Sequence, residues 1–293
     1  MHHFPKWFYI GLALNISGWA ISWLQVKPLS YFTFFVIWLG FILVIDGINF
    51  RIRKSSLLSE SKINFVFLFI ASSLFWWYFE IIVRFTQNWY YFTDRALSVI
   101  EHQLLGTLYF STVIPAVLEV TEFLANKRIF AEPIKIVRLR KRHYFFFLIM
   151  AILSFILPVA WPSIFFGLIW LSLFFILDYF NYKHGFDSLT QDLIHNKWNR
   201  IFYLGVATLI CGLFWELWNS KADPHWAYEV PFVGSVKIFE MPVLGYLGYI
   251  PFGWEVFAFY SFLRGVAKFP EVRFFNLSKI KIAGAPNKRK III

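Results

Sequence analysis

Charged residues and cysteine are both scarce in this sequence, and each scarcity excludes a class of protein. Only 15% of the 293 residues are charged, whereas 59% are hydrophobic. A soluble domain usually has about 25% charged and about 45–50% apolar residues, so this chain has too little polar surface for a water-soluble globule. The single cysteine, Cys211, excludes an intramolecular disulfide and a thiolate metal cluster.

The motifs of soluble enzymes are missing too. The sequence contains no glycine-rich dinucleotide fingerprint, no P-loop and no H-E-x-x-H zinc motif. Its seven histidines are scattered, so we expect no metal site and no cofactor. An Asp-rich diphosphate–magnesium motif is also absent, which argues against a polyprenyl transferase.

Long apolar stretches take the place of polar surface, and a stretch of about 20 apolar residues can span a bilayer. They occur at 7–25, 31–50, 64–84, 100–124, 143–159, 162–182, 200–219 and 238–263. The first lacks an A-x-A cleavage site and is expected to be a retained anchor. The sequence therefore predicts an all-α integral membrane protein with about eight transmembrane helices.

Lysine and arginine predict the orientation, because they are retained in cytoplasmic loops. With the N-terminus in the cytoplasm, all but five of the 28 Lys and Arg residues fall on the cytoplasmic side. The five exceptions are Lys27, Arg84, Arg95, Lys221 and Lys237. We therefore expect a multi-pass protein of the cell (inner, cytoplasmic) membrane with both termini in the cytoplasm.

Two basic runs stand out within the net charge of +11: RLRKRH at 138–143 and NKRK at 287–290. Basic residues near anionic headgroups gain about 1 kcal/mol each, so we expect membrane lipids rather than nucleic acid as their partners. A basic linker at 127–142 separates two membrane units, 1–126 and 143–264, and a basic tail follows at 265–293. The pattern leaves the oligomeric state open.

The two units share residues in the same order, which indicates an internal repeat. The matched positions, at offsets between 132 and 139, are Trp38 with Trp170, Asp46 with Asp178, Asn49 with Asn181, Trp76 with Trp215, Trp89-Tyr90-Tyr91 with Trp226-Ala227-Tyr228, Glu101 with Glu240, and Glu119 with Glu255. Each unit has an even number of spans, so we expect two parallel four-helix repeats about a pseudo-twofold axis along the membrane normal. A site is then expected where the halves meet.

Acids inside apolar spans are candidate catalytic residues, because a charged side chain at the bilayer centre costs about 2.5–3.5 kcal/mol. Glu101, Glu216 and Glu240 fall near the outer ends of their spans, whereas Glu119 and Glu255 lie deeper, one turn after a proline. Proline kinks a helix, so we expect each deep acid to face the kink. Two interpretations are open: a protonated acid facing a cavity, or a carboxyl group that hydrogen-bonds a neighbouring helix.

Aromatic residues accompany these acids and are candidate substrate-binding residues. Trp76, Trp215 and Trp254 lie in spans beside acids, and Trp226 and Tyr228 follow in an outer loop. Indole faces can stabilise a developing cation. The alternatives are an aromatic belt at the interface for the loop pair and ordinary packing for the tryptophans.

Three short motifs in the second unit form a recognisable series. They are Trp215-Glu216, Trp226-Ala227-Tyr228, and the stretch from Ile250-Pro251 to Glu255-Val256-Phe257. Over about fifty residues this series resembles the small membrane domain of the heterodimer- and fusion-type lycopene cyclases. That family carries two adjacent acids just after the proline and usually three spans, whereas this chain has Phe252 and Gly253 at those positions and four expected spans.

The resemblance implies acid-catalysed cyclisation or isomerisation of an isoprenoid or carotenoid-type lipid without net redox change. Glu255 would then be the first candidate for the acid, with Glu216 or Glu240 as the counter-base, and the aromatic rings would shield the carbocation. Two other hypotheses remain beside this membrane enzyme. One is a small proton- or cation-coupled transporter or channel, and the other is a non-catalytic lipid-binding or assembly protein.

Overall fold

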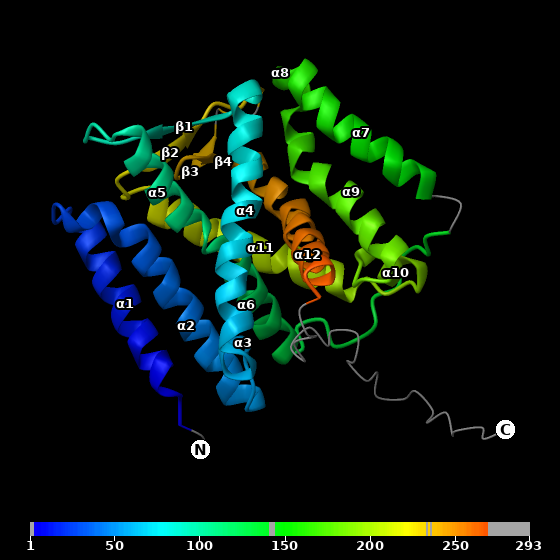
Figure 1. Ribbon diagram of the computed structural model, residues 1–293, viewed down its shortest axis with the longest axis horizontal. Coiled ribbons are helices and arrows are strands. Elements are labelled where there is room, and N and C mark those ends of the chain that lie inside the picture. Colours follow the sequence, from blue (N-terminus) through cyan, green and yellow to red (C-terminus); the bar gives the residue numbers. More distant parts are fainter. Residues whose placement is uncertain (1–2, 141–143, 233, 235, 269–293) are drawn as a thin grey trace.

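Helices make up most of the chain in this computed structural model, which describes residues 3–140, 144–232, 234 and 236–268 (Figure 1). Within these residues, five helical segments are long and apolar enough to cross a membrane: Leu29–Arg53, Lys62–Thr86, Val99–Asn126, Pro162–His184 and Asn199–Asn219. They indicate a membrane protein. The basic run at 138–143 lies partly outside the described residues, and so does the tail at 265–293, including the run at 287–290.

The first half of the chain contains six α-helices, one 3₁₀ helix and one strand in its described residues. They are α1 (Lys6–Trp23), η1 (Leu29–Phe32), α2 (Thr33–Arg53), α3 (Leu57–Glu60), α4 (Lys62–Thr86), β1 (Trp89–Phe92), α5 (Val99–Phe110) and α6 (Val113–Asn126). Residues 127–140 then run over the second half without regular secondary structure.

The second half begins with an apolar helix that is shorter than a full span. Its described elements are α7 (Tyr144–Ala160), α8 (Pro162–Phe165), η3 (Phe166–Leu168), α9 (Ile169–His184), α10 (Leu189–Ile194), α11 (Asn199–Asn219), β2 (His225–Tyr228), β3 (Lys237–Ile238), β4 (Met241–Pro242), η4 (Val243–Gly248) and α12 (Tyr249–Val266).

The expected span at 100–124 is broken into α5 and α6 rather than kinked at Pro115. The break falls at Ser111 and Thr112, and Pro115 lies in the first turn of α6, where a missing backbone N–H has no helical partner to lose. Ser72 of α4 satisfies the opened backbone, because its hydroxyl donates to Phe110 O (2.5 Å) and accepts from Ile114 N (3.0 Å).

The expected span at 238–263 becomes α-helical only from Tyr249. Residues 237–242 form the β3–β4 hairpin, and η4 follows it. Pro242 and the glycines of η4 disfavour an α-helix here. Pro251 again falls in the first turn of a helix, α12, so the predicted kink in front of Glu255 was wrong.

Strands β1 and β2 come from different halves and pair antiparallel. Trp89 pairs with Tyr228 and Tyr91 pairs with Trp226. The side chains of these four residues point to one face of the ribbon, because alternate strand residues face alternate sides; Tyr90, on the other face, is 41% exposed. The sequence pattern placed these residues in loops and missed the strands.

The two ends of the helices differ in charge. The end that carries β1 and β2, here named the ribbon end, lies opposite the N-terminus (Figure 1). At the other end, here named the basic end, α2 finishes at Arg53, α4 begins at Lys62, and Lys127 follows α6.

Four central helices join the halves. Helix α6 packs on α4 and α11, and α12 packs on α11 and α4. On one side of this core α1 lies along α2, which contacts α6; on the other, α7 lies along α9, which contacts α12. The buried aromatic residues Phe75 and Phe79 of α4 contact Phe252 of α12, so the core continues across the boundary between halves.

Gly40 lets α1 and α2 approach closely, so Gly40→Ala is expected to destabilise the fold by about 1–3 kcal/mol. The added Cβ would lie 2.7 Å from Gly11 O and 2.9 Å from Asn15 Cα. Gly167→Ala is the matched control, because a Cβ there meets no atom of the described chain within 4 Å. SDS-induced unfolding in mixed micelles compares the two variants, and equal midpoints would contradict the expectation.

Candidate functional site

A cavity of about 420 Å³ lies at the ribbon end, between the two halves of the chain. Small-molecule sites usually measure about 300–1,000 Å³, so the cavity can hold a ligand or a segment of a longer one. Its wall residues are Phe34, Trp76, Asn88, Trp89, Tyr91, Tyr109, Phe110, Val113, Phe166, Gly167, Ile169, Trp170, Trp215, Pro224, Trp226, Tyr228, Val230, Met241, Leu244, Gly245, Leu247, Gly248, Tyr249 and Phe252.

Aromatic rings dominate this wall and come from both halves. Four of the five predicted substrate-binding residues are among them: Trp76, Trp215, Trp226 and Tyr228. The fifth, Trp254, lies elsewhere, where its indole N–H donates to Ile201 O (3.1 Å). Such a wall suits an apolar ligand with extended π electrons, which can stack against indole and phenol faces.

Glu216 of α11 lies behind the cavity wall, bound by two wall tyrosines. Its Oε1 accepts hydrogen bonds from the hydroxyls of Tyr249 (2.7 Å) and Tyr228 (2.9 Å). Trp226 in turn donates its indole N–H to Tyr228 Oη (2.8 Å). The Glu216 side chain is fully buried, and its Oε2 has no hydrogen-bond partner among the described residues.

A second acid of the same kind, Glu80 of α4, lies behind the wall on the side of the first half. Its Oε1 accepts from the Tyr91 hydroxyl (2.6 Å) and from the Trp76 indole N–H (3.0 Å). Tyr91 and Tyr228 occupy matched positions of the repeat expected from the sequence, and each half places the tyrosine of its Trp-x-Tyr motif against an acid of a preceding helix.

Both ribbon tyrosines keep their protons. Burial, and next the adjacent Glu216 carboxyl, raise the pKa of Tyr228 well above its ordinary value. Burial and Glu80 do the same to the pKa of Tyr91. Both phenols therefore act as hydrogen-bond donors to their acids and present neutral rings to the cavity.

Glu255, the first candidate for a catalytic acid, lies apart from the cavity wall. Its Oε1 accepts from Leu173 N (2.9 Å) and from the Ser172 hydroxyl (3.5 Å), both on α9. Ser172 is also bonded to the hydroxyl of Tyr78 (2.8 Å). This contact corresponds to the alternative interpretation, in which the carboxyl hydrogen-bonds a neighbouring helix.

Glu119 is equally buried and lies in the half nearer the basic end. Its Oε2 accepts from the Asn49 amide of α2 (2.9 Å), and its carboxyl interacts with that of Asp46. Glu119 and Glu255 are therefore held by different helices in separate polar clusters. The structure does not bring them together with Glu216.

Glu101 and Glu240 are surface residues in the structure. Glu101 completes a capping box at the start of α5: its Oε2 accepts from Ser98 N (2.9 Å), and its other oxygen pairs with Arg95. Glu240 lies in the turn between β3 and β4, where it pairs with Lys237 (3.9 Å). These contacts explain both acids as structural groups outside the cavity.

Several wall residues had no place among the predicted site residues. Tyr249 is the most consequential, because it binds Glu216 across 33 positions of sequence. Nothing in its local sequence marks it; only the packing of α12 on α11 brings it there. Tyr91 could have been found, since it matches Tyr228 in the repeat.

The described residues contain no cluster of three or more His, Cys, Asp or Glu side chains that could hold a metal ion. Comparison with family models, with curated proteins and with solved structures yields no match for this chain. Its function is therefore inferred from the site.

Proposed function

We propose that the chain is a multi-pass membrane protein built from two parallel four-helix units. The eight proposed spans are α1, α2, α4, α5–α6, α7, α8–α9, α11 and α12. The packing of α1 on α2 and α2 on α6 in one half parallels that of α7 on α9 and α9 on α12 in the other. The register of β1 on β2, in which matched residues exchange partners, supports a twofold axis through the ribbon.

The basic end is proposed to face the cytoplasm. The Lys and Arg residues at this end of the helices support the orientation, because Lys and Arg are enriched in cytoplasmic loops. Both termini would then lie in the cytoplasm, and the cavity would lie in the outer half of the cell membrane.

We infer that the cavity binds an elongated apolar lipid of isoprenoid type and that the protein is an enzyme acting on it by acid catalysis. The observation that carries this proposal is the aromatic cavity backed by two acid–tyrosine pairs, one from each half. We propose Glu216 rather than Glu255 as the acid, because its two tyrosine partners are part of the cavity wall. Glu80 is the proposed counter-base.

The chemistry implied by the resemblance to lycopene cyclases fits this arrangement. Glu216 lies behind the wall, so its proton reaches the ligand through Tyr228 or Tyr249. The tyrosine hydroxyl gives its proton to one carbon of a polyene double bond, which leaves a tertiary carbocation on the ligand, and Glu216 reprotonates the tyrosine. The electron pair of a second double bond forms the ring carbon–carbon bond, and a carboxylate then removes a proton from the ring. The product is an isomer of the substrate, so the step needs no oxidant or reductant. Aromatic faces stabilise the cation between the two proton transfers.

Binding can be measured with lycopene as the probe and the protein in nanodiscs, through quenching of tryptophan fluorescence by energy transfer to the polyene. Val113→Trp fills part of the cavity, so we expect its affinity to fall at least about tenfold. Leu104→Trp is the control, since Leu104 is 66% exposed and lies outside the cavity wall. Equal affinities of the two variants, with intact thermal unfolding, would remove the cavity as the binding site.

A proton- or cation-coupled transporter is the second candidate. It is favoured by two fully buried acids. Glu255 has one carboxyl oxygen without a hydrogen-bond partner among the described residues, and the Glu119 carboxyl lies against that of Asp46, so the two can share a proton. Such acids in apolar spans often serve proton relays. Proton flux into proteoliposomes that disappears in Glu119→Gln or Glu255→Gln would support this candidate over the enzyme.

A further inference from the structure

The cavity has a roof made by the β1–β2 ribbon. Trp89 and Tyr91 of β1 and Trp226 and Tyr228 of β2 all contribute to its wall. Asn219 of α11 fixes β2, because its amide donates to Trp226 O (2.7 Å) and accepts from Trp226 N (2.8 Å). The ribbon therefore separates the cavity from the surroundings beyond the ribbon end.

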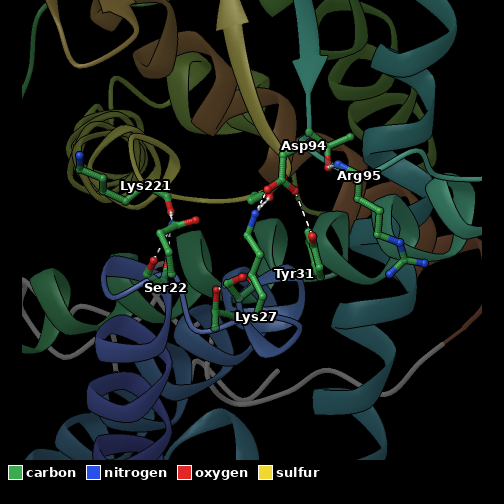
Figure 2. A network of polar contacts seen from close by, with 11 residues as sticks. Ser22, Lys27, Tyr31, Asp94, Arg95 and Lys221 are labelled. Atoms are coloured by element: carbon green, nitrogen blue, oxygen red, sulfur yellow. Dashed lines mark hydrogen bonds and ion pairs between the residues drawn. The ribbon is translucent and has the colours of Figure 1, made fainter.

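One edge of this roof is fastened by a set of polar contacts (Figure 2). Lys27 pairs with Asp94, just after β1, and lies 3.9 Å from Asp223, just before β2. The hydroxyl of Tyr31 donates to Asp94 (3.0 Å). Lys27 thus links both strands to the α1–α2 connection; we name Lys27, Tyr31, Asp94 and Asp223 the roof clamp.

A neighbouring contact joins the two halves at the same edge. The side chains of Ser22 and Gln25 donate to Lys221 O, at 3.2 and 2.7 Å. Figure 2 shows Ser22 pointing to the Lys221 backbone beside the clamp. The roof is therefore held on the side of the first half, and opening it would break several hydrogen bonds and an ion pair.

The opposite edge of the cavity is different, because its wall reaches the molecular surface there. Leu244 and Leu247 of η4 line the cavity and are 59% and 60% exposed. Gly167 of η3 also lines it and is exposed. The two elements face each other, since a Cβ on Gly248 would lie 3.3 Å from Trp170 at the start of α9.

The surface around this opening is apolar. Trp161 and Ile164, beside η3, are 56% and 62% exposed, and Val243 of η4 is 41% exposed. Exposed apolar side chains at this density suit hydrocarbon rather than water. Lys237 and Glu240 of the adjoining hairpin pair with each other, as expected at headgroup level.

We propose that the gap between η3 and η4 is a lateral portal through which a ligand passes directly between the lipid bilayer and the cavity, while the clamped ribbon closes the route from water. This inference rests on the proposed binding function and adds its route and its ligand class: a membrane-dissolved apolar chain.

The position of the portal can be tested without any ligand. Leu247→Cys offers one reactive thiol, because the native Cys211 is buried. A nitroxide on residue 247 in liposomes is expected to be relaxed by oxygen several-fold more than by a water-soluble nickel chelate. Tyr90→Cys, on the outer face of the ribbon, should show the reverse. A label at 247 that responds mainly to the nickel chelate would overturn the portal.

Its use as the route can be tested by stopped-flow fluorescence with lycopene supplied in liposomes. Ile164→Phe and Val243→Phe, beside the opening but outside the cavity wall, are expected to slow association and dissociation by the same factor, at least about fivefold, and to leave the dissociation constant unchanged. Leu104→Phe should retain both rates. Faster exchange in Lys27→Ala, with no effect of the portal variants, would overturn the proposal in favour of access through the roof. Lycopene that fails to bind any variant, beside a lipid-exposed label at 247, would instead count against the proposed ligand while leaving the portal in place.

Discussion

The Glu216→Gln variant is expected to lose at least about 100-fold of isoprenoid turnover, because a positioned general acid contributes about 10²–10⁴-fold. Glutamine has nearly the same size and can still accept a hydrogen bond from Tyr228 or Tyr249 through its carbonyl. It cannot deliver a proton. Product analysis by chromatography, in a host that accumulates lycopene or a comparable polyene, measures the loss.

Two further measurements separate chemistry from folding in this experiment. Polyene binding to Glu216→Gln, followed by tryptophan quenching, should remain within a few-fold of the unsubstituted protein. Glu101→Gln is the control acid, since its side chain is 42% exposed and caps α5. Full turnover by both Glu216→Gln and Glu80→Gln would end the acid-catalysis proposal, and a lipid profile unchanged by the unsubstituted protein would end the enzyme proposal altogether.

The Asp178→Ala variant is expected to lose about 3–5 kcal/mol of stability. Asp178 is fully buried, and its carboxyl accepts from Leu189 N (2.7 Å), Thr190 N (2.7 Å) and the Thr190 hydroxyl (2.6 Å). Alanine would leave these donors without partners, and an unsatisfied buried group costs about 1–3 kcal/mol. SDS-induced unfolding in mixed micelles measures the change.

Two further variants serve as controls for the loss of stability expected in Asp178→Ala. Asp178→Asn keeps one carbonyl oxygen as an acceptor and should lose less than half as much. Asp187→Asn breaks only the ion pair with Arg264 at the end of α12, where Asp187 is 31% exposed, so its effect should be near the 0–1 kcal/mol of partly exposed pairs. A small loss in Asp178→Ala would mean that water reaches these donors.

The membrane character could be predicted from composition alone, because apolar length is a property of the local sequence. The positions at which α6 and α12 begin, Val113 and Tyr249, could not be predicted from the sequence. They depend on how Ser72 and the β3–β4 hairpin satisfy the hydrogen bonds of the backbone before each helix. The depth of Glu255 in an apolar span likewise favoured it as the catalytic acid. Its partner, Leu173 N, is known only once α12 has packed on α9.

The candidate site was predicted in part for the same reason. The pairs Trp215-Glu216 and Trp226-x-Tyr228 carry a local signature, and their residues lie at or just behind the cavity wall. Tyr249 and the ribbon pairing carry none, because their contacts join segments distant in sequence. The predicted position of Glu240 near the end of a helix was wrong, because the β3–β4 hairpin and η4 occupy the stretch 238–263 up to Gly248.

The exchange of partners in the β1–β2 ribbon bears on how such a chain could arise. Trp89 contacts Tyr228 just as Trp226 contacts Tyr91, which is the contact that two identical subunits make across a dyad. If the two halves are the repeat proposed above, an ancestral half could have worked as a homodimer that closed the same chamber with two copies of one strand. On that proposal, joining the copies in a single polypeptide would have freed each half to diverge, which accounts for Glu216 in one half and for Trp77 at the aligned position of the other, where Glu80 binds the tyrosine instead.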